Sequence, residues 1–454
     1  MGITFVEKGG VRRRPNAKTA LVLAGGAISG GAFKIGGLIA LNAYFDKRSV
    51  CDFDTYVGIS AGAFLAAPLA VGVQPEELLR SIEGRSRRIS QFTPSHFYKP
   101  NWREFIAKPF LFGRDAIGLV PAVSLTMAGL LTTDRSQMIN VARRFLDEPS
   151  YVNAEHVVLP MIRAFERRSQ LQRGLSYLPS GVFDSRGIER FIRENFERNG
   201  MANHFRLLKL ERDKDLYIGA TNLNTAAGVI FGHDEDCSVT ISEAVQASST
   251  IPGFFRPVRL NGHDYIDGGV QKTANISQAV KSGAQLVIAY NPFRPFVNFH
   301  ADQLLNGQRT MSDMGILTVI NQAFRTLLHT RLMLGIEKLR LDQSFHGDVI
   351  LIEPSETDIT FFNLNPLAFW RRAEAAEHGF SSVKEAIERH HERISRILAR
   401  YGIGTNLDRL RRNTELIRQA HYDNDAIIDV LEQRVHERRA VPRRPPKLRV
   451  VGER

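Results

Sequence analysis

Short apolar runs alternate with helix-like stretches over the first seventy residues. Residues 20–23 form an apolar run of the length of a buried strand, and glycines follow it directly. Apolar side chains recur at helical spacing over 33–45, residues 53–57 form a second strand-like run, and an Ala- and Leu-rich helix pattern ends near Val71. This order of strand, glycine turn, helix, strand, sharp turn and helix predicts an α/β fold with a mostly parallel central sheet.

The alternation stops and later returns. Residues 91–182 show no sheet pattern and include an uncharged stretch at 116–133, so we expect an insertion there. Strand-like runs return further along the chain, at 216–220, 229–231, 286–290 and 349–352. A long amphipathic helix is expected over 316–334, and the chain after Trp370 has a helical pattern.

The positive charge is concentrated at the two ends of the sequence. The net charge is +12. Residues 434–454 carry +6 and residues 1–18 carry +4, so the rest of the chain is close to neutral. A nucleic-acid-binding protein would show its basic stripe on the folded body, so no nucleic acid partner is expected. The two basic ends are either solvated, disordered segments or arms that bind an anionic membrane surface.

We therefore expect several segments. They are a basic N-terminal arm at 1–18, a main α/β domain at 19–380 with the insertion at 91–182, a helical C-terminal extension at 381–433 and a basic disordered tail at 434–454. The composition, 43% hydrophobic and 24% charged, is that of a globular protein. Two cysteines cannot form a disulfide framework, which fits a reducing compartment. We recognise no signal peptide or transmembrane helix and expect a cytoplasmic protein, with peripheral membrane association as an alternative.

The sequence GISAG at residues 58–62 is the strongest chemical signal. A serine nucleophile at a sharp strand-to-helix turn needs small neighbours, which Gly58 and Gly62 supply around Ser60. The motif follows an expected strand and precedes an expected helix, as this chemistry requires. Ser60 is therefore the candidate nucleophile.

Two further motifs complete a candidate site. The glycine-rich turn that contains Gly25, Gly26, Ala27 and Gly30 fits neither a dinucleotide loop nor a phosphate loop, but its exposed N–H groups could form an oxyanion hole. The sequence DGG begins at Asp267, whose carboxylate is held by a tight turn and could act as a base.

Together these motifs resemble the patatin-like phospholipase family, which has a glycine-rich oxyanion loop, a G-x-S-x-G turn and an Asp-Gly-Gly/Ala motif. Residues 241–255 and 221–231 also resemble that family. The resemblance implies a three-layer α/β fold and a lipid acyl hydrolase, of the phospholipase A or lysophospholipase type, that needs no metal or organic cofactor. It implies that Ser60 is the nucleophile and Asp267 its base, that Gly25, Gly26 and Ala27 form the oxyanion hole, and that supporting glycines lie at Gly58, Gly62, Gly30, Gly268 and Gly269.

This chain departs from the family pattern at two positions. Ala27 stands at the third glycine, and Ser29 stands where the family has Arg or Lys. Lys34 lies nearby but at a different spacing. These departures keep open a catalytically weak or silent lipid-binding or scaffold protein on the same fold.

The histidines and the insertion each allow more than one interpretation. A Ser-His-Asp triad would need a histidine after Ser60, and the candidates are His233, His263, His300 and His329. No histidine cluster has metal-ligand spacing, so no metal is expected. The insertion 91–182 is either a lid or acyl-chain-binding cap over Ser60, or an ordinary buried helical layer. The oligomeric state and the head group of the lipid are left open by the sequence.

Overall fold

The computed structural model describes residues 2–108, 178–298 and 310–412. The chain forms two compact units. The larger contains Met1–Tyr98, Ser185–Pro252 and Pro257–Arg454, and the smaller contains Lys99–Asp184 and Gly253–Arg256. Within the smaller unit, β5 (Gly181–Phe183) pairs in parallel with β8 (Gly253–Phe255).

A central sheet organises the larger unit. Its strands run in the order β1-β12-β11-β2-β4-β6-β10-β9, and β7 also pairs with β6. Pairing is parallel from β12 through β11, β2 and β4 to β6, and antiparallel at β1, β7, β9 and β10. The strands are β1 (Gly2–Glu7), β2 (Thr19–Leu23), β4 (Thr55–Ile59), β6 (Asp215–Asn222), β7 (Gly228–Phe231), β9 (Val258–Leu260), β10 (His263–Asp267), β11 (Leu286–Tyr290) and β12 (Asp348–Glu353). The fold is thus α/β with a mostly parallel central sheet, as the sequence predicts.

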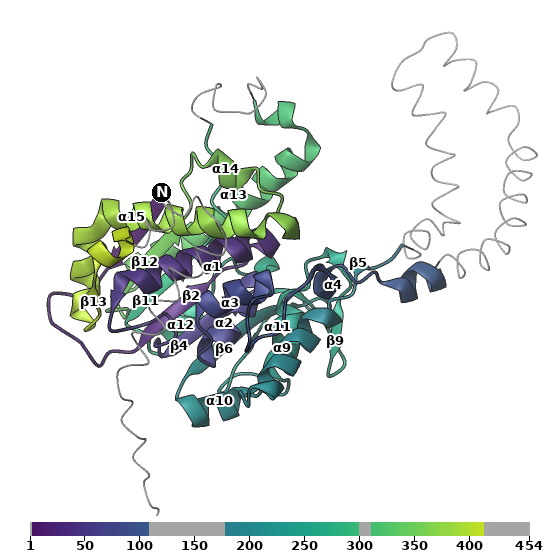
Figure 1. The fold of residues 1–454 in the computed structure, drawn as a ribbon, viewed down its shortest axis with the longest axis horizontal. Helices are drawn as coiled ribbons and strands as arrows, with labels where there is room; N and C mark the ends of the chain where they lie inside the picture. Colours follow the sequence, from purple (N-terminus) through teal and green to yellow (C-terminus); the bar gives the residue numbers. More distant parts are fainter. Residues whose placement is uncertain (1, 109–177, 299–309, 413–454) are drawn as a thin grey trace, which may run out of the picture. The chain divides into compact units, whose positions relative to one another are not determined.

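The larger unit also contains α-helices. They are α1 (Ala27–Tyr44), α2 (Ala61–Ala70), α3 (Pro75–Glu83), α4 (Pro94–Phe97), α9 (Arg186–Arg198), α10 (Phe205–Arg212), α11 (Ile241–Ser248), α12 (Ile276–Lys281), α13 (Ile316–Leu341), α14 (Ile359–Phe362) and α15 (Arg372–Arg400). Two short strands, β3 (Phe45–Asp46) and β13 (Gly404–Thr405), pair with each other. Figure 1 shows α15 lying along α1 across strands β11 and β12.

Alternation along the strands produces the layers. In β12, Val349 and Leu351 join a core with the α12 and α13 side chains. The intervening Ile350 and Ile352 face a small apolar space lined by residues of α1 and α15. Because successive strand residues point to opposite faces, both faces of β12 are buried, as expected for a parallel strand between two helical layers.

The N-terminal segment differs from the basic arm expected at 1–18. Strand β1 pairs antiparallel with β12 along its whole length, and Val6 is buried. The Arg14 guanidinium donates hydrogen bonds to Gln285 and to the carbonyl of His346, whereas Arg12 and Arg13 are exposed. The apolar residues of β1 form the edge of the sheet. The net charge of residues 1–18 does not indicate this strand, because it reflects only the charged side chains of the segment.

The boundary expected at 380/381 falls inside α15. This helix packs along α1 at a very close approach. A Cβ added at Gly379 would lie 1.9 Å from the carbonyl oxygen of Phe33, and one added at Gly36 would lie 1.7 Å from that of Ala376. Glycine at both positions lets the two backbones touch, so α15 is part of the main domain.

Most of the expected insertion lies outside the described residues, which end at 108 and resume at 178. Its role as a lid or as a buried layer stays a prediction. The expected tail at 434–454 also lies outside the described residues. Among the described helices, none combines the length and the apolar composition needed to cross a bilayer.

Candidate active site

Ser60 occupies the turn between β4 and α2. Its backbone has φ 55° and ψ −128°, a conformation that non-glycine residues rarely adopt and that is typical of functional turns. A Cβ at Gly58 would lie 2.5 Å from Cα of Ala63, and one at Gly62 would lie 2.0 Å from the carbonyl oxygen of Leu23. Only glycine allows α2 to start so close to β2 and β4, which explains both glycines of the motif.

Asp267 lies at the end of β10, next to Ser60. Strand β6 pairs with both elements: Gly219 is opposite Ile59, and Ala220 is opposite Asp267. Successive residues of β6 therefore bring the ends of β4 and β10 together. The Ser60 hydroxyl lies close enough to the Asp267 carboxylate to lower its pKa, and both side chains are almost fully buried.

Burial raises the pKa of Asp267 from 3.8 to about 6, because the charged form loses its hydration. Three neighbours oppose this effect. The backbone N–H of Gly269 donates a hydrogen bond to Oδ1 at 2.7 Å, and the Ser60 hydroxyl and the Lys34 ammonium also favour the charged form of the carboxylate. The carboxylate can therefore both accept and release a proton near neutral pH.

The turn after Asp267 is held from two sides. A Cβ at Gly268 would lie 2.3 Å from a carbonyl oxygen of β6, so a larger residue would separate β10 from β6. On the other side, the Arg331 guanidinium of α13 donates to the carbonyls of Gly269 and Val270. Arg331 has no motif in the sequence that would mark it.

Helix α11 supports the backbone of Ser60. The Ser248 hydroxyl accepts a hydrogen bond from the Ser60 N–H at 2.8 Å and donates to the Gly219 carbonyl at 2.6 Å. The start of α11 is fixed by a capping box in which the side chains of Thr240 and Glu243 accept each other's backbone N–H groups.

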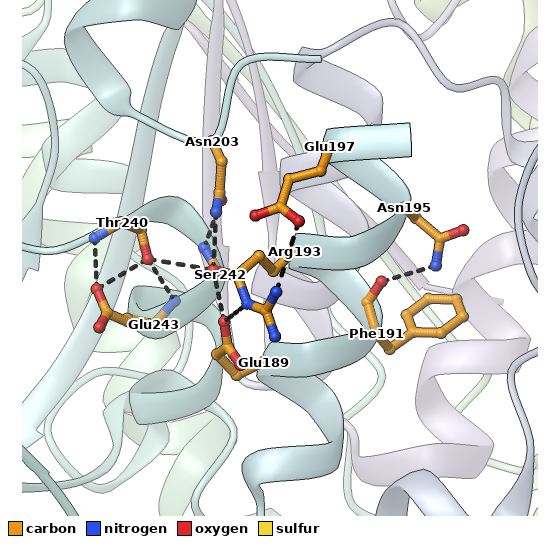
Figure 2. Close-up of polar contacts among 9 residues, drawn as sticks. All are labelled: Glu189, Phe191, Arg193, Asn195, Glu197, Asn203, Thr240, Ser242 and Glu243. Atoms are coloured by element: carbon orange, nitrogen blue, oxygen red, sulfur yellow. Dashed lines mark hydrogen bonds and ion pairs between the residues drawn. The ribbon is translucent and has the colours of Figure 1, made fainter. Parts of the chain in front are cut away.

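Figure 2 shows how α9 anchors the same helix start. Asn203 accepts from the Ser242 N–H and donates to its hydroxyl, both at 3.0 Å. The Ser242 hydroxyl in turn donates to Glu189, which also pairs with Arg193. This network fixes α11, and α11 fixes the strained turn at Ser60.

The glycine-rich turn lies beside Ser60. A Cβ at Gly25 would be 3.4 Å from Cβ of Ser60. Gly26 has φ 150° and Ala27 has φ 50°, so the alanine adopts the backbone conformation that the family's glycine permits without strain. Within residues 2–108, 178–298 and 310–412, the N–H groups of Gly25, Gly26 and Ala27 have no hydrogen-bond acceptor. They are placed as candidate donors to an oxyanion.

The next N–H groups along this turn are already used. Those of Ile28 and Ser29 donate to the carbonyl of Pro366 at 3.0 and 3.1 Å, and that of Gly30 donates to Gly26. The possible donor set therefore ends at Ala27. Pro366, more than 300 residues away in sequence, caps the first turn of α1, and no local pattern indicates this contact.

Lys34 is the other functional candidate that the sequence motifs missed. It is completely buried in α1, and its ammonium donates to the carbonyls of Ala24 and Gly25. Burial lowers its pKa to about 7, while the charge of Asp267 opposes this effect. The sequence could have indicated Lys34 by its position seven residues after Ala27, because residues two helical turns apart lie on the same face of a helix.

The candidate triad histidines have other partners. His329 contacts Glu353 at 3.3 Å, His233 contacts Asp215 and Asp234, and His263 packs against Tyr265. His300 lies outside the described residues. In the described ranges, no histidine hydrogen-bonds to Ser60 or Asp267. No group of three His, Cys, Asp or Glu side chains suited to a metal occurs there either.

Comparisons with known proteins identify the family of this chain. A sequence model of the family described as patatin-like phospholipase matches residues 21–280, more than half of the chain. A protein called probable lipid hydrolase 463L, from Invertebrate iridescent virus 6, is 22% identical over 268 residues. That match covers 59% of this chain and 65% of the viral protein.

Two solved structures have loose overall similarity. VipD from Legionella pneumophila is 17% identical, with a TM-score of 0.35 over 86% of this chain and 70% of VipD. Full-length ExoU in complex with SpcU, from the type III secretion system of Pseudomonas aeruginosa, is 14% identical, with a TM-score of 0.24 over 95% and 69%. Because the family model matches more than half of the chain, the chain belongs to the patatin-like phospholipase family.

Proposed function

We propose that this protein is a lipid acyl hydrolase that cleaves carboxylic esters through Ser60 and Asp267. The observation that carries the proposal is the sheet register, which brings Ser60, on its strained turn, next to the buried carboxylate of Asp267. Family membership and the name of the viral relative support a lipid substrate. The phospholipase A or lysophospholipase subtype is a finer proposal, decided by the substrate panel described below.

The reaction begins with Ser60. Its Oγ attacks the ester carbonyl carbon and transfers its proton to Asp267, while the carbonyl oxygen becomes an oxyanion. The N–H groups of Gly25, Gly26 and Ala27 are the donors available to stabilise that charge. Collapse of the intermediate breaks the ester C–O bond, and the leaving alcohol takes the proton from Asp267.

Water completes the cycle. It attacks the acyl-Ser60 ester and gives a proton to Asp267, and a second tetrahedral intermediate forms. When this collapses, the fatty acid leaves and Ser60 regains the proton. Asp267 thus acts first as base, then as acid, which a carboxyl with a pKa near 6 can do at neutral pH.

The test is a hydrolysis panel with the full chain. Diacyl phospholipids, lysophospholipids, triacylglycerol and a soluble short-chain ester are compared for wild type, Ser60→Ala and Asp267→Asn. We expect wild-type hydrolysis of at least one lipid, no turnover by either variant, and labelling of Ser60 by a fluorophosphonate. Lipid binding without hydrolysis by the wild type would show a silent lipid-binding protein instead. Turnover lost equally in His329→Ala would replace the dyad with a triad.

A further inference from the structure

Lys34 is a buried cation that the proposed reaction does not yet use. Its side chain has no solvent exposure, and its Nζ donates to the carbonyl oxygens of Ala24 and Gly25, the second at 2.7 Å. Removing an ammonium from water is expensive unless other groups replace its hydration. These two carbonyls and the charge of Asp267 replace part of that hydration, although burial still lowers the pKa of Lys34.

The two carbonyls lie in the peptide units that carry the candidate oxyanion donors. A trans peptide unit is planar, and its C=O and N–H point in opposite directions. Turning the carbonyl of Ala24 toward Lys34 therefore turns the N–H of Gly25 away from it. In the same way, holding the carbonyl of Gly25 directs the N–H of Gly26 away from Lys34.

These two N–H groups are free to bind an oxyanion. Neither has an acceptor among the described residues, and Gly25 packs against Ser60. A flexible glycine turn could rotate these peptide units in many ways, because glycine permits most backbone angles. Two hydrogen bonds from a fixed ammonium limit that rotation.

The position of Lys34 in a helix explains its reach. Long side chains in a helix project toward the helix N-terminus, and α1 begins directly after the glycine-rich turn. A lysine two turns into α1 can therefore contact the turn that precedes the helix. Ser29, where the family has a basic residue, cannot supply this charge.

We infer that Lys34 is a positioning residue, which holds the carbonyls of Ala24 and Gly25 so that the N–H groups of Gly25 and Gly26 face the reacting carbonyl at Ser60. The inference rests on the proposed hydrolase function. In this chain the positive charge beside the glycine-rich turn belongs to a residue two turns into α1. In the family pattern it belongs to the residue at the position of Ser29.

The experiment compares Lys34→Met with wild type on a soluble short-chain ester. Methionine keeps most of the apolar stem but lacks charge and donors. Lys214→Met is the control, because Lys214 is a half-buried lysine whose pKa is also lowered by burial, and it lies just before β6, far along the strand from the site. We measure kcat, KM, the rate of fluorophosphonate labelling and thermal unfolding. Loss of one oxyanion-hole donor typically lowers kcat by about 10²–10³-fold.

We expect Lys34→Met to lower kcat and the labelling rate by about 10²-fold, with KM changed less than threefold, and Lys214→Met to match wild type. A folded Lys34→Met with wild-type kcat, or with a change in KM alone, overturns the inference. If Lys34→Met does not fold, Lys34→Gln decides. Its shorter, uncharged side chain should lower kcat at least tenfold, and wild-type turnover would refute the inference. Absence of Ser60-dependent hydrolysis in the wild type would instead refute the proposed function.

Discussion

Replacing Asp267 with asparagine is expected to stabilise the folded protein while it abolishes ester hydrolysis. The carboxylate is buried, and its pKa is raised from 3.8 to about 6. At neutral pH the folded protein therefore holds a charge that the unfolded chain would hydrate better. Asparagine is neutral at every pH, can accept the Gly269 N–H through its oxygen, and can donate to the Ser60 hydroxyl.

The magnitude follows from the pKa difference. Each pKa unit corresponds to about 1.36 kcal/mol, so a shift from 3.8 to about 6 destabilises the ionised folded state by about 3 kcal/mol. This penalty is complete above pH 6. As the pH falls from 6 to 4, the folded state binds a proton before the unfolded chain does, and the penalty disappears.

The assay is urea unfolding of wild type and Asp267→Asn between pH 4.5 and 8. We expect the variant to be more stable by about 3 kcal/mol at pH 8, with the difference shrinking below pH 6. Asp264→Asn is the control with the opposite sign, because Arg259 lowers the pKa of that carboxyl by hydrogen bonding. An Asp267→Asn variant that is no more stable than wild type at pH 8 would refute the reasoning.

Three further predictions concern activity, packing and lipid binding. First, kcat/KM for a soluble ester should fall about tenfold per pH unit below pH 6, because protonated Asp267 cannot act as a base; a flat profile from pH 5 to 8 would contradict this. Second, Gly62→Ala should lower the free energy of unfolding by about 1–3 kcal/mol, measured by thermal unfolding, because the added Cβ would meet the backbone of β2. Gly335→Ala should not lower it, because the added Cβ would lie in open space. Third, deletion of 434–454 should weaken binding to anionic vesicles most at low salt and leave soluble-ester turnover unchanged; equal vesicle binding would show that this tail does not bind lipid.

Local patterns predict the parallel strands of the central sheet, β2, β4, β6, β11 and β12, and the motif turns. The apolar runs at 286–290 and 349–352 coincide with β11 and the centre of β12, because a strand buried on both faces leaves a continuous apolar run. The placement of Ser60 between a strand and a helix also followed from the sequence, because glycines at both sides fit only a sharp turn.

Contacts between distant segments could not be predicted in this way. The carbonyl of Pro366 caps α1, and Arg331 holds the turn after Asp267, although neither residue belongs to a motif. Lys34 lies at a different spacing along the chain from the family's basic residue, but a helix brings residues seven apart to one face. Strand β1 was not predicted, because the basic residues that follow it give residues 1–18 a high net charge. That value says nothing about the apolar segment of six residues at its start.

The close approach of α1 and α15, together with the pairing of β1 with β12, has a consequence for synthesis on the ribosome. The matched region, 21–280, contains every motif residue, yet the partners that cover α1 and the first strand are translated only after residue 340. A nascent chain that has just emerged with Ser60 and Asp267 still exposes the apolar face of α1, and Pro366 has not yet capped the glycine-rich turn. Long-range contacts of this kind form only after both partner segments have been translated. The glycine-rich turn beside Ser60 and the apolar face of α1 are therefore covered only after the chain has been translated to about residue 400.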